Sequence, residues 1–188
     1  TPANAAAASD VYKREARFLK DSPLVDKRLL GDYISRAENV DVLAEYMDMF
    51  DFGECDVAEA MRALCEAFRL PGEAQQIARI TETFARKYFA SKPPGIRSED
   101  AVYVLAYSII MLNTDLHNPQ VTRRMTTADY QRNLRGVNDG ADFDQAYLAA
   151  IYDGIRRREI VMPEEQAGQL GFDYAWKELL RRARAGNT

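Results

Sequence analysis

Apolar residues recur at three- and four-residue spacing in segment after segment of this chain, and no stretch sustains a two-residue alternation bounded by hairpin turns. The first pattern is typical of amphipathic helices and the second of strands. Pro71-Gly72 and the run from Lys92 to Gly95 interrupt the pattern and frame one helix between them. The sequence therefore predicts an all-α fold.

The predicted helices differ in length and in the loops that join them, so a solenoid of regular repeats is disfavoured. Their ranges are about 10–20, 26–35, 39–50, 56–68, 98–116, 126–134, 142–157 and 171–185, with one more helix between Gly72 and Lys92 that carries the apolar residues from Ile77 to Phe89. Asn39 and Ser98 are predicted N-caps, and the first four helices are expected to pack as consecutive antiparallel pairs. The nearly all-apolar centre of the 98–116 segment predicts a buried central helix. The last range holds the only tryptophan, Trp176.

A chain of 188 residues with 47% hydrophobic content is about the size of one domain. Residues 1–9 are small and alanine-rich and are expected to form a flexible lead, which leaves residues 10–188 as the predicted domain. The formal net charge of −4 disfavours nucleic acid as a partner. Arginine clusters at 123–124, 156–158 and 181–184 could face an anionic membrane, but solvated helix faces or ends are the interpretation that we prefer.

The residue inventory argues against metal, nucleotide and covalent chemistry. Cys55 and Cys65 fit no metal-ligand spacing and make a poor disulfide framework, which favours a reduced cytosolic setting. His117 is the only histidine, and Asp115 is too near in sequence to orient it easily, so a histidine metal site or a Ser-His-Asp triad is disfavoured. No glycine-rich phosphate cradle occurs. We therefore expect no metal and no bound cofactor.

A group of acids around Gly140 has some features of a calcium loop. Asp139, Asp142 and Asp144 lie there, but the required order of acids before the glycine, and a glutamate six residues after it, are absent. The most hydrophobic run, from Ala101 to Leu112, is too short to cross a membrane. Neither a calcium site nor a membrane span is expected.

Two polar segments border long apolar helices. In residues 68–73 a helix ends, a turn follows, and Glu73 stands at the next helix start, where acids are common because they complement the helix dipole. An acid at such a turn would also protrude, which suits a group that enters another protein's pocket. Residues 111–119 put polar side chains directly after an apolar run and end at Pro119, which by itself indicates no more than a polar C-terminal turn.

The two segments together resemble the two signature motifs of the Sec-seven domain, and their separation matches as well. The first motif is FRLPGEAQ at residues 68–75 and the second is LNTDLHNP at residues 112–119. The similarity extends from about residue 30 to residue 182 and includes NLRGVN at residues 133–138. Residues 159–165 and 174–176 are similar to the large Golgi exchange factors of the Gea and Golgi brefeldin-resistance group, rather than to the small cytohesins.

The resemblance implies a fold and an activity. The fold would be a single elongated, all-α, right-handed superhelix of about ten helices, arranged in two lobes with a hydrophobic groove between them. The chain would be one domain of a longer protein. The activity would be guanine nucleotide exchange on Arf-family GTPases, a catalysis without covalent chemistry. Glu73 would act as an acidic finger that enters the phosphate site near the β-phosphate, competes with Mg²⁺ and pairs with the phosphate-binding lysine.

The resemblance also implies a GTPase-binding groove for the displaced switch regions. Its expected residues lie at helical spacing or beside it: Tyr107, Ile110, Met111, Thr114, Asp115 and Asn118. The alternative for Ile110 and Met111 is that they belong to the core. Family members sensitive to brefeldin A carry a set of residues that this chain matches with Tyr107, Ser108, Asp115 and Met125, so we expect that the toxin binds there.

The expected partners are an Arf-family GTPase, both GDP-bound and nucleotide-free, and brefeldin A as an interfacial inhibitor. Membrane contact would come only through the partner or the parent protein, with a cytoplasmic location, peripheral at Golgi membranes. A helical adaptor that binds a GTPase without catalysing exchange is the alternative, and an intact Glu73 argues against it. A metal-dependent or hydrolytic enzyme is a third possibility, which the single histidine disfavours.

Overall fold

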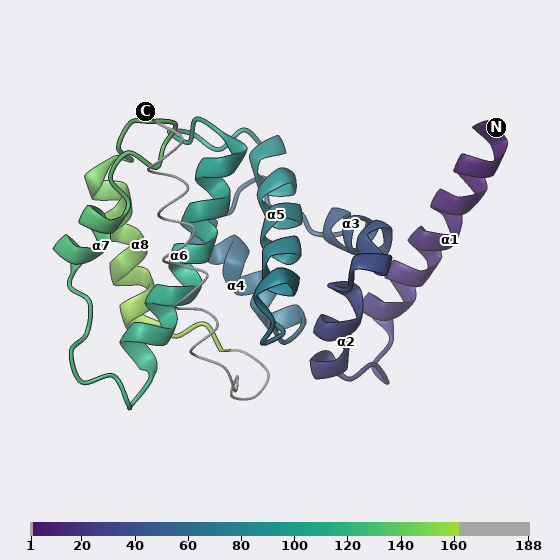
Figure 1. Ribbon diagram of the computed structural model, residues 1–188, viewed down its shortest axis with the longest axis horizontal. Coiled ribbons are helices and arrows are strands. Elements are labelled where there is room, and N and C mark those ends of the chain that lie inside the picture. The colour runs from purple at the N-terminus through teal and green to yellow at the C-terminus, as the bar shows by residue number, and fades with distance from the viewer. Residues whose placement is uncertain (1, 162–188) are drawn as a thin grey trace.

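Helices make up nearly all of the regular structure in the computed structural model, which describes residues 2–161 (Figure 1). The elements are α1 (Pro2–Asp21), α2 (Lys27–Ile34), the 3-10 helix η1 (Ala37–Asn39), α3 (Val40–Asp48), α4 (Val57–Ala67), α5 (Ala74–Ala90), α6 (Glu99–His117), α7 (Thr127–Asn133) and α8 (Gln145–Arg157). Within these residues the only β pairing is an isolated bridge between Asn138 and Ala141. The predicted all-α fold is confirmed. The helix expected at 171–185, with Trp176, lies outside the described residues.

Side-chain caps explain where most of the helices begin. The cap oxygen accepts a hydrogen bond from a backbone N–H of the first turn at Asp26, Asp56, Ser98, Thr126 and Asp144, with donor–acceptor distances of 2.8–3.2 Å. The predicted cap Ser98 is therefore confirmed. Asn39 occupies the N-cap position of α3, as predicted, but its side chain makes no cap bond and donates instead to the Tyr33 carbonyl at 2.7 Å.

Two helix starts differ from the predicted ranges. Helix α1 begins at Pro2 rather than near residue 10, because the alanine run at residues 5–8 has the highest intrinsic helix propensity. Helix α8 begins at Gln145 rather than near Asp142. The Asp142 carboxylate accepts a 2.8 Å hydrogen bond from the Gly136 N–H, and this ties Asp142 to the preceding loop.

The first four helices do not pack as consecutive antiparallel pairs, so this prediction was wrong. Helix α1 packs mainly on α3, and α3 packs in turn on α5. The ammonium group of Lys20 in α1 lies 3.6 Å from the centroid of the Phe50 ring, just beyond α3. Helix α2 has only eight residues and contacts α3. Neighbours in space are therefore often two elements apart in sequence.

Helix α6 is the centre of the second half of the molecule. It packs against α5, α4 and α8, and eleven of its nineteen residues are buried, which confirms the predicted central helix. Figure 1 shows the helices spread along the long axis, with α1 at one end and α7 and α8 at the other. None of the described helices is both long and apolar enough to cross a membrane.

Candidate functional site

The Glu73 turn, residues 68–73, joins α4 to α5 and presents an acid. Phe68 and Leu70 are 0% and 1% exposed, so their side chains anchor the turn in the core. Pro71-Gly72 then reverses the chain, and Glu73 occupies the N-cap position of α5 with extended backbone angles. Its carbonyl accepts the first bond of the helix from the Ile77 N–H at 3.0 Å. The turn is therefore fixed by apolar anchors on one side and by a helix on the other.

The Glu73 side chain is exposed and makes no cap hydrogen bond to the first turn of α5. Among residues 2–161, no side chain or backbone group forms an ion pair or hydrogen bond with its carboxylate. A cap bond would have satisfied a helix N–H, as Asp56 and Asp144 do for α4 and α8. Glu73 instead presents to the solvent, at a helix N-terminus, a carboxylate that has no partner among residues 2–161.

Helix α6 extends to His117, so the helical spacing assumed for the groove residues holds as far as that residue. Tyr107 and Ile110 are each 1% exposed, and Ile110 lies in the core cluster, in agreement with the core alternative for that residue. Met111 is half-buried and packs against the core. Thr114, Asp115 and Asn118 are also half-buried and lie near the end of the helix.

The polar residues at the end of α6 have partners within the domain. The Thr114 hydroxyl donates to the Ile110 carbonyl at 3.1 Å, and the Asn118 side-chain oxygen accepts from the Gln120 N–H at 2.9 Å. The single histidine, His117, lies with its Nε2 atom 2.7 Å from the Ile155 carbonyl, which links α6 to α8. In the part of the chain that the structure describes, no group of three or more His, Cys, Asp or Glu residues could hold a metal ion.

The four residues expected to bind brefeldin A fall into two places. The Asp115 carboxylate accepts a 2.6 Å hydrogen bond from the Met125 N–H, so these two residues are in contact. Tyr107 and Ser108 lie about two turns earlier on α6 and are each 1% exposed. The Ser108 hydroxyl is 2.8 Å from the Tyr130 hydroxyl of α7, and burial raises the pKa of Tyr107 well above its ordinary value. The toxin site stays a prediction.

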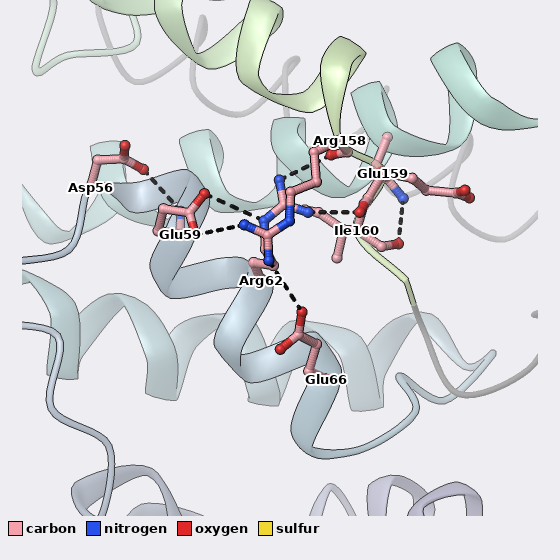
Figure 2. Close-up of polar contacts among 8 residues, drawn as sticks. Asp56, Glu59, Arg62, Glu66, Arg158, Glu159 and Ile160 are labelled. Atoms are coloured by element: carbon pink, nitrogen blue, oxygen red, sulfur yellow. Dashed lines mark hydrogen bonds and ion pairs between the residues drawn. The ribbon is translucent and has the colours of Figure 1, made fainter.

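Two residues that hold the chain after α8 were not predicted from the sequence, and Figure 2 shows the first of them, Arg62. Arg62 of α4 is 3% exposed, and its guanidinium donates to the carbonyls of Glu159 at 2.7 Å and Arg158 at 3.0 Å. Asn113 of α6 makes reciprocal hydrogen bonds with Ile160, at 3.1 Å to the Ile160 carbonyl and 2.8 Å from its N–H. Asn113 lies within the second motif, so that motif could have drawn attention to it, whereas Arg62 had no such signal.

The arginines at the end of α8 pair with acids of the same chain. Arg156 and Arg157 form ion pairs with Asp153, and Arg158 pairs with Glu59 and Glu66 of α4, as Figure 2 shows for Arg158. This agrees with the interpretation of the cluster as a solvated helix end. The cluster at 181–184 lies outside the described residues.

Comparison with protein families and curated proteins gives a consistent result. The family described as the Sec7 domain matches residues 4–160. "Brefeldin A-inhibited guanine nucleotide-exchange protein 2" of Arabidopsis thaliana is 44% identical over 164 residues, which are 86% of this chain and 9% of that protein. "ARF guanine-nucleotide exchange factor 2" of Saccharomyces cerevisiae is 43% identical over 190 residues, 92% of this chain and 13% of that protein. The chain therefore spans about a tenth of these relatives.

Solved structures agree with this result. A structure described as "ARF1-GDP bound to Sec7 domain complexed with Brefeldin A" is 47% identical, has a TM-score of 0.76, and is matched over 82% of this chain and 80% of that one. The "Sec7p catalytic domain" is 32% identical with a TM-score of 0.75 and covers 79% of each chain. Because the family match spans most of the sequence and includes both signature segments, this chain belongs to the Sec7 domain family.

Proposed function

We propose that this domain is a guanine nucleotide exchange factor for an Arf-family GTPase and that Glu73 is the acid that expels GDP. The observation that carries the proposal is the exposed Glu73 carboxylate, which has no partner in the described part of the chain and lies on a turn anchored in the core. The printed names of the relatives, which are exchange factors, and the solved complex of a Sec7 domain with ARF1-GDP support it.

The proposed chemistry is electrostatic. Glu73 would enter the phosphate site of the GTPase near the β-phosphate, compete with Mg²⁺ and pair with the phosphate-binding lysine. Two unit charges 4 Å apart interact by about 4 kcal/mol at an effective dielectric of about 20. Each 1.4 kcal/mol changes an affinity about tenfold, so one acid would weaken GDP binding by about three decades. No covalent bond forms in this process. Once GDP has left, GTP loads by mass action because it is more abundant.

The remaining contribution would come from a surface near α6 that holds the displaced switch regions. Met111, Thr114, Asp115 and Asn118 are half-buried and are therefore accessible in part to a partner. Tyr107 and Ile110 are buried, so their contact with a GTPase would require α6 to be uncovered locally. The proposed architecture around this surface is an elongated right-handed superhelix of two lobes. The row of helices along the long axis in Figure 1 supports the elongated shape.

We also propose that brefeldin A traps the complex of this domain with the GDP-bound GTPase. The contact between Asp115 and Met125 supports the idea, because two of the four expected residues are adjacent. So does the 47% identity to a Sec7 domain solved with the toxin. Exchange should then fall at saturating brefeldin A with a susceptible Arf substrate, and an unchanged rate would overturn this part. The name of one relative, which contains the words "Golgi-specific", supports a location at Golgi membranes. We propose that this location is peripheral and on the cytoplasmic side.

The test of the exchange activity uses an Arf-family GTPase loaded with a fluorescent GDP analogue. Release is followed with excess GTP and catalytic amounts of the native domain, of Glu73→Lys, or of Glu82→Lys. Glu82 is a matched control, because it is an exposed acid on the same helix α5. We expect acceleration by the native domain and by Glu82→Lys, and none by Glu73→Lys.

Binding separates the exchange factor from an adaptor. Glu73→Lys should still bind the GDP-loaded GTPase, because the groove contacts are intact. If the native domain binds several Arf paralogues but accelerates release from none of them, it is an adaptor, and the exchange proposal is wrong.

A further inference from the structure

Helix α2 contacts both ends of the segment that carries Glu73. On the α4 side, the Lys27 carbonyl accepts a 3.0 Å hydrogen bond from the Arg69 N–H. The ammonium group of Lys27 also donates to the Glu66 carbonyl at 3.0 Å, near the end of α4. The chain that leads into the Glu73 turn is therefore bonded to the first turn of α2.

Gly31 lets α2 approach this segment closely. A Cβ atom on Gly31 would lie 1.8 Å from the Arg69 carbonyl oxygen and 3.1 Å from a ring carbon of Phe68. A contact of 1.8 Å with backbone is impossible, so any side chain at this position must move α2 away from the turn. A glycine is required at position 31 because the backbones of α2 and of Arg69 lie too close together for a side chain between them.

Gln76 makes the second connection, on the α5 side. It lies in the first turn of α5, three positions after Glu73, and is 7% exposed. Its amide nitrogen donates to the Asp32 carbonyl at 3.2 Å and to the Asp32 carboxylate at 3.1 Å. Hydrogen bonds from Arg36 and Gln76 hold the pKa of Asp32 below its ordinary value, so the carboxylate is a charged acceptor at neutral pH.

We propose that α2 is a positioning element for Glu73, which acts through the close approach at Gly31 and the Gln76–Asp32 hydrogen bonds. This inference rests on the proposed exchange function. An acid that must enter a partner's phosphate site loses part of its effect if the turn first has to be ordered, and a misplacement of about 1 Å costs about a hundredfold in rate. Because α2 is bonded on both sides of Glu73, the turn keeps its place before the GTPase arrives.

Gln76→Glu tests the proposal in the exchange assay. The new carboxylate faces the Asp32 carboxylate and carbonyl, which repel it, so the α5 side of the turn should move. We expect the maximal exchange rate to fall about tenfold, with little change in KM for the GTPase, since docking surfaces on α6 are untouched. Gly31→Ala would act in the same direction, but it would also disturb the core, so the test rests on Gln76.

A rescue variant distinguishes the hydrogen bond from a general effect of charge. In Asp32→Asn/Gln76→Glu the asparagine amide can donate to the new carboxylate, so the repulsion between two carboxylates is replaced by a hydrogen bond. Only the weaker repulsion from the Asp32 backbone carbonyl remains. This double variant should recover most of the maximal rate, while Asp32→Asn alone, which keeps the side-chain oxygen as acceptor for Gln76, should be close to native. Failure of the double variant to recover would contradict the proposal.

The Glu73→Ala background separates positioning from stability. If Gln76 acts through Glu73, Gln76→Glu should slow exchange in the native domain and have no further effect on the residual rate of Glu73→Ala. An equal slowing in both backgrounds, or a native rate for Gln76→Glu, would overturn the positioning role. If Glu73→Ala itself exchanges at the native rate, the proposed function fails, and this outcome is distinct from the others.

Discussion

Asp115 and Met125 are joined by a 2.6 Å hydrogen bond from the Met125 N–H to the Asp115 carboxylate. The bond fastens the loop before α7 to the last turn of α6. The Tyr152 hydroxyl of α8 donates to the Met125 carbonyl at 2.7 Å, and Arg124 donates to the Asp115 carbonyl at 3.0 Å. Asp115 therefore organises its own domain as well as facing a proposed partner, and its variants need a structural readout beside activity.

Asp115→Ala should release the Met125 amide. A hydrogen bond to a charged acceptor contributes about 1.5–3 kcal/mol, so the exchange rate of the Met125 amide hydrogen should rise about 10–100-fold. Asp115→Asn keeps an oxygen acceptor and should show a smaller rise. Hydrogen exchange followed by NMR measures both, and native protection of Met125 in Asp115→Ala would contradict the role that we assign to this bond.

Arg62→Met should destabilise the domain by about 2–4 kcal/mol. The substitution keeps the apolar stem but removes the donor of two part-buried hydrogen bonds to the carbonyls of Arg158 and Glu159. Arg86→Met is the control, because Arg86 is 70% exposed and its distance from Glu99 is 4.0 Å, so its loss should change stability little. Denaturant unfolding of the three proteins gives the comparison, and equal midpoints would refute the prediction.

Asn113→Leu should also destabilise the domain, by about 1–3 kcal/mol, because both hydrogen bonds to the Ile160 backbone are lost. Arg62 and Asn113 hold adjacent residues of one segment, 158–160. Once the hydrogen bonds of one of these residues are lost, the segment can detach from the domain, and the hydrogen bonds of the other residue then contribute less to stability. The loss of stability in Arg62→Met/Asn113→Leu should therefore be smaller than the sum of the two single losses. Additive losses of stability would show that Arg62 and Asn113 act independently.

The two cysteines should react very differently with an alkylating reagent. Cys55 is exposed, whereas burial raises the pKa of the Cys65 thiol to about 12. At pH 8 the folded domain should take up one equivalent rapidly, and the second only after unfolding. Because the ordinary thiol pKa is about 9, the stability due to a neutral Cys65 is complete below pH 9 and is lost as pH rises from 9 towards 12. Rapid modification of both thiols at pH 8 would contradict this prediction.

Interactions between residues close in sequence were sufficient to predict much of the secondary structure. The three- and four-residue apolar spacing predicted the helices, and Ser98 and Pro71-Gly72 marked boundaries that the structure keeps. These features depend on groups within a few residues of one another, such as a cap oxygen and the N–H three positions later. The position of Glu73 at a helix start could be read for the same reason.

The sequence alone therefore determined the helical class, most helix limits and the presence of an acid on a turn. Only the tertiary structure decided that α1 packs on α3, that Gly31 meets Arg69, and that Arg62 reaches carbonyls 96 and 97 residues away. The physical reason is that these contacts join residues that are far apart in the sequence. Hydrogen-bond and packing partners between distant segments are selected by how several apolar faces are buried together, and this selection leaves no periodic signal in any one segment.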